Sequence, residues 1–399
     1  MTSPTPFLWG AATAAHQVEG GNRWNDWWAL EEAGRLPHRS GEACRHYELY
    51  ETDFDLARSL GHNAHRLSLE WSRIEPAEGE WNEPALAHYA AVLAALRARG
   101  LEPLVTLQHF TLPAWLANRG GWLAPDALDH FARYADTAAR AFAGEVRHWI
   151  TINEPTVYVK HAYLACDWPP CGRRSWQAAA RALRRLGRAH VRAYDILHRR
   201  RPDVMVGLSH SSPWVAPCNP DRAVDRLAAR LRDLALNEIP FRCLGRPARD
   251  ALDFIGVNYY ARQVVRARGA SPFGRECTED HHGAKRHFST LGWEVFAPGL
   301  AEVLRRFSRF GLPLFVTENG IATEDEHERT QYLRDHVASL MRARDSGLDV
   351  RGYFWWTLMD NYEWTSGREA RFGLCETDYA TQARRPRPAA LAFRDLIGR

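Results

Sequence analysis

The feature that most constrains the fold is a set of eight short stretches of apolar, β-branched and aromatic residues that recur along the whole chain. They cover residues 7–10, 64–69, 103–108, 148–152, 204–209, 254–257, 314–317 and 353–356. Longer segments with helical periodicity lie between them, at 83–99, 126–143, 176–200, 298–310 and 330–346. Strands that alternate with helices favour a parallel sheet. Eight such units predict a (β/α)8 barrel, the TIM barrel of the α/β class.

No feature of the sequence divides the chain into separate domains. It contains no linker, no low-complexity tract and no shift in composition. A length of 399 residues is compatible with one large barrel. We therefore expect a single catalytic domain over residues 1–399.

Composition indicates an ordinary globular protein, with 45% hydrophobic and 25% charged residues. The first 21 residues have neither a basic start nor an unbroken apolar stretch as long as that of a signal peptide. No later run approaches the length of a membrane span. These observations predict a cytoplasmic protein with no membrane partner.

The densest basic segment, residues 173–201, carries arginines at helical spacing with Ala and Leu between them: Arg181, Arg184, Arg185, Arg188 and Arg192. One interpretation is a row of phosphate contacts for a nucleic acid. The other is the solvated outer face of a helix, which explains the same spacing without a partner. We favour the second interpretation and expect no nucleic-acid partner. The segment neither requires nor excludes an oligomer.

Seven cysteines are scattered along the chain without a repeating spacing. Four of them could in principle be zinc ligands, namely Cys166, Cys171, Cys218 and Cys243. Their spacing is poor for zinc, because four residues separate the first two and no second pair matches them. We expect free thiols in a reducing compartment, and we predict neither a metal nor an organic cofactor.

Polar residues follow the predicted strands at the points where they end. In a (β/α)8 barrel the functional groups lie at the C-terminal ends of the strands, so these residues should converge on one face. They are Arg66, Glu70 and Trp71 after the second strand, Gln108 and His109 after the third, Asn153 and Glu154 after the fourth, His210 after the fifth, Asn258 and Tyr260 after the sixth, Glu318 and Asn319 after the seventh, and Trp356, Asp360 and Asn361 after the eighth.

Two of these residues, Glu154 and Glu318, indicate a specific chemistry. Each ends an apolar, β-branched run, in TINEP at 151–155 and VTENG at 316–320, and 318 − 154 = 164 residues separate them. Two facing carboxyl groups can cleave a glycosidic bond, with one as the attacking carboxylate and the other as a protonated acid. Their mutual repulsion raises the pKa of one of them, so that it retains a proton near neutral pH.

Residues near the two glutamates fit the same chemistry. Arg66 could keep one carboxylate ionised, and the amide of Asn153 could bond the sugar hydroxyl next to the reacting carbon. Asn-Glu-Pro is also typical of a helix cap, and taken alone it favours neither interpretation. The second motif, Thr-Glu-Asn-Gly at 317–320, makes catalysis the better explanation.

Aromatic residues are abundant, and the chain has 16 tryptophans. Indole rings stack on the C–H faces of sugars while the ring N–H reaches hydroxyl groups. In YFWWTLMDNYEW, we expect Tyr353 and Trp355 to pack in the core and Trp356 to end the strand. Glu363, set among aromatic residues before Trp364, needs a partner that a sugar diol would supply.

Seven motifs in order resemble those of glycoside hydrolase family 1, the retaining β-glucosidase and β-galactosidase family, over nearly the full chain. They are FLWGAATAAHQVEG (7–20), HRLSLEWSRIEP (65–76), TLQHFTLPAW (106–115), TINEP (151–155), DFIGVNYY (253–260), VTENG (316–320) and WWTLMDNYEW (355–364). Each motif is moderately specific, and seven in the family order are strongly so.

The resemblance implies a retaining exo-β-glycosidase that acts on small β-glucosides or short oligosaccharides, with β-galactosides and β-fucosides as further candidates. It implies Glu154 as acid/base and Glu318 as the nucleophile that forms a covalent glycosyl-enzyme intermediate, with the carboxyl groups about 5 to 5.5 Å apart. By motif, the sugar that is cleaved off, the glycone, would contact Gln17, His109, Asn153, Glu363 and Trp364, and would stack on Trp356. Arg66 and Tyr260 would contact the nucleophile, and Asn258 would support the same region.

The sequence departs from the family pattern on both sides of the bond that is cleaved. Phe110 stands where tryptophan is common, which removes an indole N–H donor to the glycone and predicts looser sugar selectivity. On the side of the leaving group, the aglycone, Thr156 stands where an aromatic residue is common and the segments 165–175 and 210–250 are short, which predicts a changed aglycone preference. His16 and Arg45 also replace residue types common in the family.

The acid at position 363 also bears on the class of sugar. Family members that act on 6-phosphorylated sugars replace this acid, and a carboxylate would repel a phosphate. Retention of Glu363 therefore favours unphosphorylated sugars, although Arg368 and Arg371 lie nearby in the sequence.

Two alternatives to a hydrolase stay open. A transglycosylating variant would use the same intermediate and transfer the sugar to an acceptor other than water. A catalytically silent sugar-binding barrel would normally lack one of the two acids, but both Glu154 and Glu318 are present.

Overall fold

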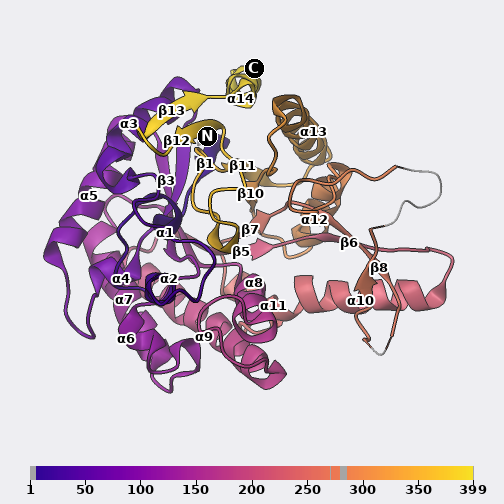
Figure 1. Cartoon of the computed structure of the whole chain (residues 1–399), viewed down its shortest axis with the longest axis horizontal. Coiled ribbons are helices and arrows are strands. Elements are labelled where there is room, and N and C mark those ends of the chain that lie inside the picture. The colour runs from indigo at the N-terminus through magenta and orange to yellow at the C-terminus, as the bar shows by residue number, and fades with distance from the viewer. Residues whose placement is uncertain (1–5, 270, 279–284, 399) are drawn as a thin grey trace.

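The computed structural model describes residues 6–269, 271–278 and 285–398, and its central feature is a closed barrel of eight parallel strands (Figure 1). The strands are β1 (Leu8–Ala12), β2 (Ala64–Ser68), β3 (Glu102–Gln108), β4 (His148–Asn153), β5 (Met205–Ser211), β7 (Phe254–Asn258), β10 (Leu314–Asn319) and β11 (Val350–Trp356). Their order around the barrel is β1-β11-β10-β7-β5-β4-β3-β2, so barrel strands that follow one another in the chain are neighbours. The predicted (β/α)8 barrel is confirmed.

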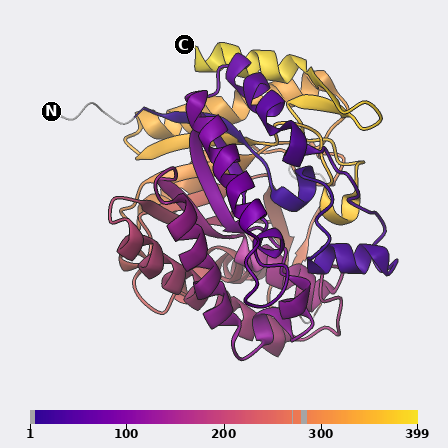
Figure 2. The same cartoon turned by 90° about the vertical axis from the view of Figure 1, so that its left-hand side faces the viewer.

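Helices surround the barrel, and in Figure 2 those of the first part of the chain, in indigo and purple, lie in front of it. The main helices that follow the eight strands in turn are α3 (His46–Ser59), α5 (Glu83–Ala98), α7 (Ala127–Phe142), α9 (Trp176–Arg200), α10 (Ala223–Asn237), α12 (Pro298–Ser308), α13 (Glu326–Asp345) and α14 (Pro388–Ile397). The five predicted helices are present. However, α13 begins four residues before the predicted position 330, because the Asp325 side chain caps it by accepting from the N–H groups of His327 and Glu328.

Shorter elements connect the strands and helices. The short α-helices are α1 (Ala15–Val18), α2 (Asp26–Glu32), α4 (Trp71–Ile74), α6 (Ala114–Ala117), α8 (Pro155–Val159) and α11 (Ile239–Arg242). A π-helix spans Lys160–Ala165, and 3-10 helices span Gly121–Leu123, Ala248–Asp250 and Trp364–Ser366. Two small sheets lie outside the barrel: β6 (Trp214–Pro217), β8 (Arg262–Arg266) and β9 (Arg275–Glu276) form one, and β12 (Cys375–Asp378) and β13 (Ala383–Pro386) form the other.

Two layers of apolar side chains hold the barrel together. The larger layer lies between the strands and the helices and includes Leu93, Trp149 and Phe307. A second cluster, which includes Phe254 and Phe315, arises from the alternate faces of the strands. Trp356 belongs to this second cluster, at the C-terminal end of β11.

The arginine-rich segment forms α9, which packs on the barrel through its alanine and leucine face. Of the five arginines predicted to lie on one helix face, Arg181, Arg184, Arg188 and Arg192 are exposed. Arg192 pairs with Asp129 of α7. This arrangement agrees with a solvated helix face. Within the described ranges, no helix combines the length and the apolar character needed to cross a bilayer.

Candidate active site

Glu318, at the end of β10, is held by a cation and a phenol. The guanidinium of Arg66 on β2 donates to its Oε1 at 2.6 Å, and the Tyr260 hydroxyl donates to its Oε2 at 2.6 Å. Burial and the neighbouring Glu318 charge raise the pKa of Tyr260 well above its ordinary value, so the phenol keeps its proton and remains a donor. Both contacts stabilise the ionised form of Glu318.

Glu154, directly after β4, has neutral partners. The Asn258 side-chain amide donates to its Oε1 at 2.9 Å and to Asn153 Oδ1 at 3.2 Å. The Asn258 carbonyl accepts from the Thr317 hydroxyl at 2.6 Å, which fixes the amide with its N–H groups toward Glu154. An amide supports a carboxylate less than a guanidinium does.

These surroundings separate the proton affinities of the two acids. Burial and the Glu318 charge raise the pKa of Glu154 to about 8, against the lowering effects of Asn258 and Arg66. Burial also raises the pKa of Glu318, but Arg66, Tyr260 and Asn258 oppose this increase. When the pair shares one negative charge, Glu318 is the better place for the charge and Glu154 for the proton.

The strands that present these acids are irregular near the carboxylates. The pairing of β4 with β5 shifts between Ile150 and Asn153, and the pairing of β10 with β7 shifts between Val316 and Glu318. Glu154 itself has a left-handed backbone with φ 42°. A regular strand points successive side chains to opposite faces, and such irregularities re-aim them. Asn153 and Glu154 therefore both reach Asn258, although they are adjacent in sequence.

Asn153 is oriented by its neighbours. Its Oδ1 accepts from Arg66 at 2.6 Å, which leaves its Nδ2 as a donor, 3.3 Å from His109 Nε2. Burial and the Arg66 charge lower the pKa of His109 well below its ordinary value, so the imidazole is neutral. The His109 ring lies nearly parallel to the rings of Trp356 and Trp364, with interplanar angles of 16° and 14°.

Three further predicted residues form a second polar group. Gln17 Nε2 donates to Glu363 Oε2 at 3.0 Å, and Trp356 Nε1 donates to the same oxygen at 3.3 Å. Gln17 Oε1 is buried and has no hydrogen-bond partner among the residues that the structure describes. Burial raises the pKa of Glu363 to about 8 in spite of the two donors. A ligand with several hydroxyl groups would donate to the unpaired Gln17 oxygen and also bond the buried carboxyl group of Glu363, because hydroxyls donate as well as accept.

The two acids share a cavity of about 170 Å³ that is open to solvent. His109, Tyr260, Trp356, Glu363 and Trp364 also line it. Its remaining lining residues were not predicted as site residues: Phe110, Val157, His161, Trp168, Leu291, Trp293, Thr365, Ser366 and Phe372. Most of these follow the strands in loops, where the sequence shows no periodic pattern. The abundance of tryptophan was the signal that could have indicated Trp168 and Trp293.

Not every polar strand end converges on this cavity, and the expectation is corrected for the following residues. His210 packs against Phe241 and Phe307 in the helical layer, because the preceding residue, Ser209, faces the barrel interior and bonds Thr317. Asp360 forms a two-pronged ion pair with Arg387, beside α14.

Asn319 also faces away from the cavity. It donates to the Tyr259 carbonyl and accepts from the Tyr353 hydroxyl at 2.8 Å. Tyr353 and Trp355 are fully buried, as predicted.

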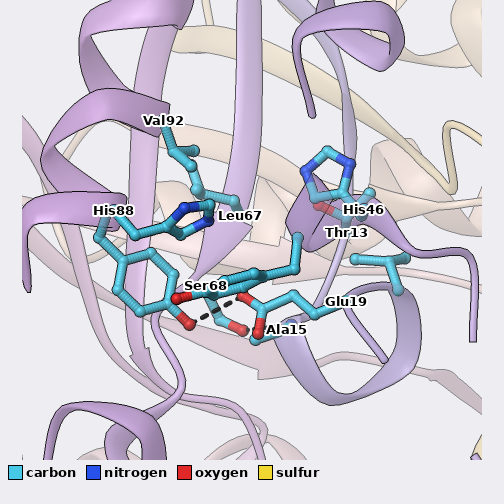
Figure 3. Close-up of a pocket in the computed structure, with 11 residues that line it drawn as sticks. Thr13, Ala15, Glu19, His46, Leu67, Ser68, His88 and Val92 are labelled. Carbon is cyan, nitrogen blue, oxygen red and sulfur yellow. Dashed lines mark hydrogen bonds between the residues drawn. The ribbon is translucent and has the colours of Figure 1, made fainter. Parts of the chain in front are cut away.

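Two other places in the molecule bring polar side chains together. A space of about 10 Å³, enough for a single water molecule, lies between β2, α3 and α5 (Figure 3). Its carboxylate, Glu19, already accepts from Tyr89 and Arg73 at 2.8 Å. The space therefore has no room for a substrate.

Within the described part of the chain, one group has the spacing of metal ligands: Glu78, Asp126 and His130. Arg119 pairs with both of its carboxylates. None of the three lines the cavity of Glu154 and Glu318.

Comparisons with known proteins agree with this geometry. The model of glycosyl hydrolase family 1 matches residues 1–242 and 244–399. A thermostable β-glucosidase B of Thermobispora bispora is 34% identical, over 100% of this chain and 91% of its own length. A β-galactosidase of Pyrococcus woesei is 30% identical, over 99% of this chain and 96% of its own. The solved β-glycosidase from Pyrococcus horikoshii superposes with a TM-score of 0.91 at 40% identity, covering 99% of this chain and 94% of that one.

The family model covers nearly every residue, and the matches to the two relatives cover 99% and 100% of the chain. The barrel, the paired glutamates and the motif order all belong to the same pattern. The chain belongs to glycosyl hydrolase family 1 and is a retaining glycoside hydrolase.

Proposed function

We propose that this hydrolase removes single unphosphorylated sugars from the non-reducing ends of β-glucosides, with β-galactosides and β-fucosides as further substrates. Glu318 is the proposed nucleophile and Glu154 the proposed acid/base. The observation that carries this assignment is the difference between their partners, Arg66 and Tyr260 for Glu318 and the Asn258 amide for Glu154.

In the first step, Glu318 attacks the anomeric carbon while Glu154 donates its proton to the leaving oxygen. The raised pKa of Glu154 lets it hold this proton near neutral pH. Arg66 bonds Asn153 Oδ1, which supports a role for the Asn153 Nδ2 group as donor to the neighbouring sugar hydroxyl. That bond strengthens in the transition state.

In the second step, the roles of Glu154 and water follow from the change in charge. The glycosyl ester removes the negative charge of Glu318, which is one cause of the raised pKa of Glu154. The pKa of Glu154 therefore falls, and the carboxylate can take a proton from the attacking water. Release of the sugar restores the Glu318 charge, and the two displacements together retain the β configuration.

The sugar class is proposed from Gln17, Glu363 and the aromatic residues. Glu363 and the unmet Gln17 oxygen accept from hydroxyls, and Trp356 presents a ring for stacking. A carboxylate at this place would repel a phosphate. Because hydroxyls in either orientation can bond these two side chains, glucose and galactose are both proposed substrates.

We also propose that residues 1–399 form one catalytic domain, that the protein is cytoplasmic, and that the reaction needs no metal or organic cofactor. The supporting observations are the uninterrupted alternation of strands and helices and seven cysteines without a repeating spacing, which suit a reducing compartment. Two carboxyl groups supply all the acid, base and nucleophilic chemistry of the reaction.

The test is hydrolysis of 4-nitrophenyl β-D-glucoside, galactoside and fucoside, with proton NMR of the sugar formed first. We expect nitrophenol release with the β anomer appearing before mutarotation. The Glu318→Gln variant, which keeps the side-chain shape, controls for contaminating activity. A first-formed α anomer would contradict the retaining mechanism, and inertness toward all three substrates would contradict the hydrolase assignment.

A further inference from the structure

Two cysteines that are far apart in sequence meet in the small sheet beside the barrel. Cys218 follows β6 and Cys277 follows β9, and their Sγ atoms are 3.0 Å apart. Both side chains are buried, with exposed fractions of 3% and 6%, and they pack against Val264 of β8. Among the described residues, the other five cysteines make no such sulfur–sulfur contact.

The backbone fixes both cysteines. The N–H of Cys218 donates to the Val265 carbonyl at 2.7 Å, and the N–H of Cys277 donates to the Val264 carbonyl at 2.8 Å. Two consecutive carbonyls of β8 therefore bind the two cysteines, and Cys218 and Cys277 lie on opposite sides of this strand. The sulfurs need to approach by about 1 Å to reach the bond length of a disulfide.

From this geometry we infer that Cys218 and Cys277 are a disulfide-forming pair that staples the β6-β8-β9 sheet. The ring so closed would span 277 − 218 = 59 residues and contain barrel strand β7 and helix α10. A ring of this length strongly restricts the unfolded chain. In Figure 1, α10 and β8 extend from the barrel at the right-hand side. A disulfide there would restrict local unfolding of this small sheet.

The oxidant in this inference is a small-molecule disulfide such as oxidised glutathione. The Cys277 thiolate attacks one glutathione sulfur, the glutathione disulfide bond breaks, and a glutathione thiolate leaves and takes a proton. The Cys218 thiolate then attacks the Cys277 sulfur and releases the second glutathione. Two protein thiols are oxidised, and one glutathione disulfide is reduced to two thiols. Burial raises the pKa of the Cys218 thiol, and Arg266, whose Nε lies 3.1 Å from Cys218 Sγ, opposes this increase and stabilises the second thiolate.

The sheet is connected to the rim of the active-site cavity. Arg286 donates to the Cys277 carbonyl and, through Nε at 2.9 Å, to Glu294. Trp293, the residue before Glu294, lines the cavity, with its ring centroid 5.3 Å from that of Tyr260. Because the disulfide forms between sulfurs already in contact, we expect the cavity to keep its shape.

The experiment is equilibration of the folded full chain in glutathione buffers of increasing oxidised fraction, followed by alkylation, thiol counting after denaturation, and peptide mapping. We expect the count to fall from seven thiols to five, with Cys218 and Cys277 in one cross-linked peptide pair. Trypsin cleavage after Arg268 and Arg275 should slow at least about threefold. Turnover of an aryl glucoside should stay within about twofold.

Cys218→Ser and Cys277→Ser should each abolish the cross-link and the protection from trypsin, whereas Cys243→Ser should retain both. If one serine variant does not fold, the other variant and the wild-type peptide map still show whether Cys218 and Cys277 form the disulfide. Oxidation that first links or glutathionylates other cysteines, or a Cys218–Cys277 pair that stays reduced while others react, would overturn the inference.

Discussion

The ends of β4 and β10 present the same side chain in different surroundings. Glu318 accepts hydrogen bonds from a guanidinium and a phenol, whereas Glu154 accepts from a neutral amide. A cation favours the ionised acid, while burial beside a like charge favours the protonated one. The comparison teaches that neighbours on β2 and β7, rather than the glutamates themselves, make Glu318 the better place for the charge and Glu154 the better place for the proton.

The largest expected effect comes from removing the attacking acid. Glu318→Gly should lower kcat by at least about 10⁵-fold on every glycoside, because no covalent intermediate can form. The measurement is turnover of aryl glucosides with leaving groups of different pKa. A loss that depends strongly on the leaving group would contradict a nucleophilic role, and an unchanged unfolding temperature controls for misfolding.

Removing the other acid should give a loss that depends on the leaving group. For Glu154→Ala, we expect kcat/KM to fall about 10³-fold on alkyl glucosides and less than about tenfold on a dinitrophenyl glucoside. A dinitrophenolate leaves without a proton, so the first step no longer needs the acid. Equal losses on the two substrates would show that Glu154 is not the proton donor.

Removing the Arg66 guanidinium should bring the pKa of Glu318 closer to that of Glu154. Arg66→Met leaves Glu318 buried without its charged partner, so the pKa of Glu318 should rise and kcat/KM should fall about 100-fold. Because the nucleophile must be ionised, the acidic limb of the pH–rate profile should move to higher pH. Arg66→Lys, which keeps the charge, is the matched control and should shift this limb less. An acidic limb that does not move would contradict the proposed role of Arg66.

The smallest expected effect concerns the amide beside Glu154. In the wild type, kcat/KM should decline as the pH rises through about 8, because Glu154 then loses the proton it must donate. In Asn258→Ala, the ionised form of Glu154 loses a donor, its pKa rises further, and this basic limb should move to higher pH. We expect kcat/KM at the optimum to fall less than about tenfold. A shift of the basic limb to lower pH would contradict the account.

Much of the fold was predictable because its signals are local. Eight apolar stretches separated by helical segments predicted the barrel, and periodicity placed α9 at its observed bounds. The glutamates were predictable because a barrel presents the C-terminal ends of its strands on one face. The contact between Arg66 and Glu318 followed from the same rule.

The rest depends on features without a local signal. Alternation along β5 sends His210 to the helical layer, and a position at a strand end does not reveal the facing of its side chain. Gln17 and Glu363 are bonded across 346 positions of sequence. The loops that carry Trp168 and Trp293 have no periodicity, although both residues line the cavity. Strand irregularities before Asn153 and Glu318 likewise arise from pairing between distant segments.

The most direct test of the account is the configuration of the glycosyl azide formed when azide rescues the two acid variants on an activated aryl β-glucoside. In Glu318→Gly, azide should attack the substrate from the face that the carboxylate vacates and give the α-glycosyl azide. In Glu154→Ala, azide should attack the covalent intermediate from the opposite face and give the β-glycosyl azide. NMR of the products decides, and the reversed pair of configurations would contradict the assignment of Glu318 as nucleophile and Glu154 as acid/base.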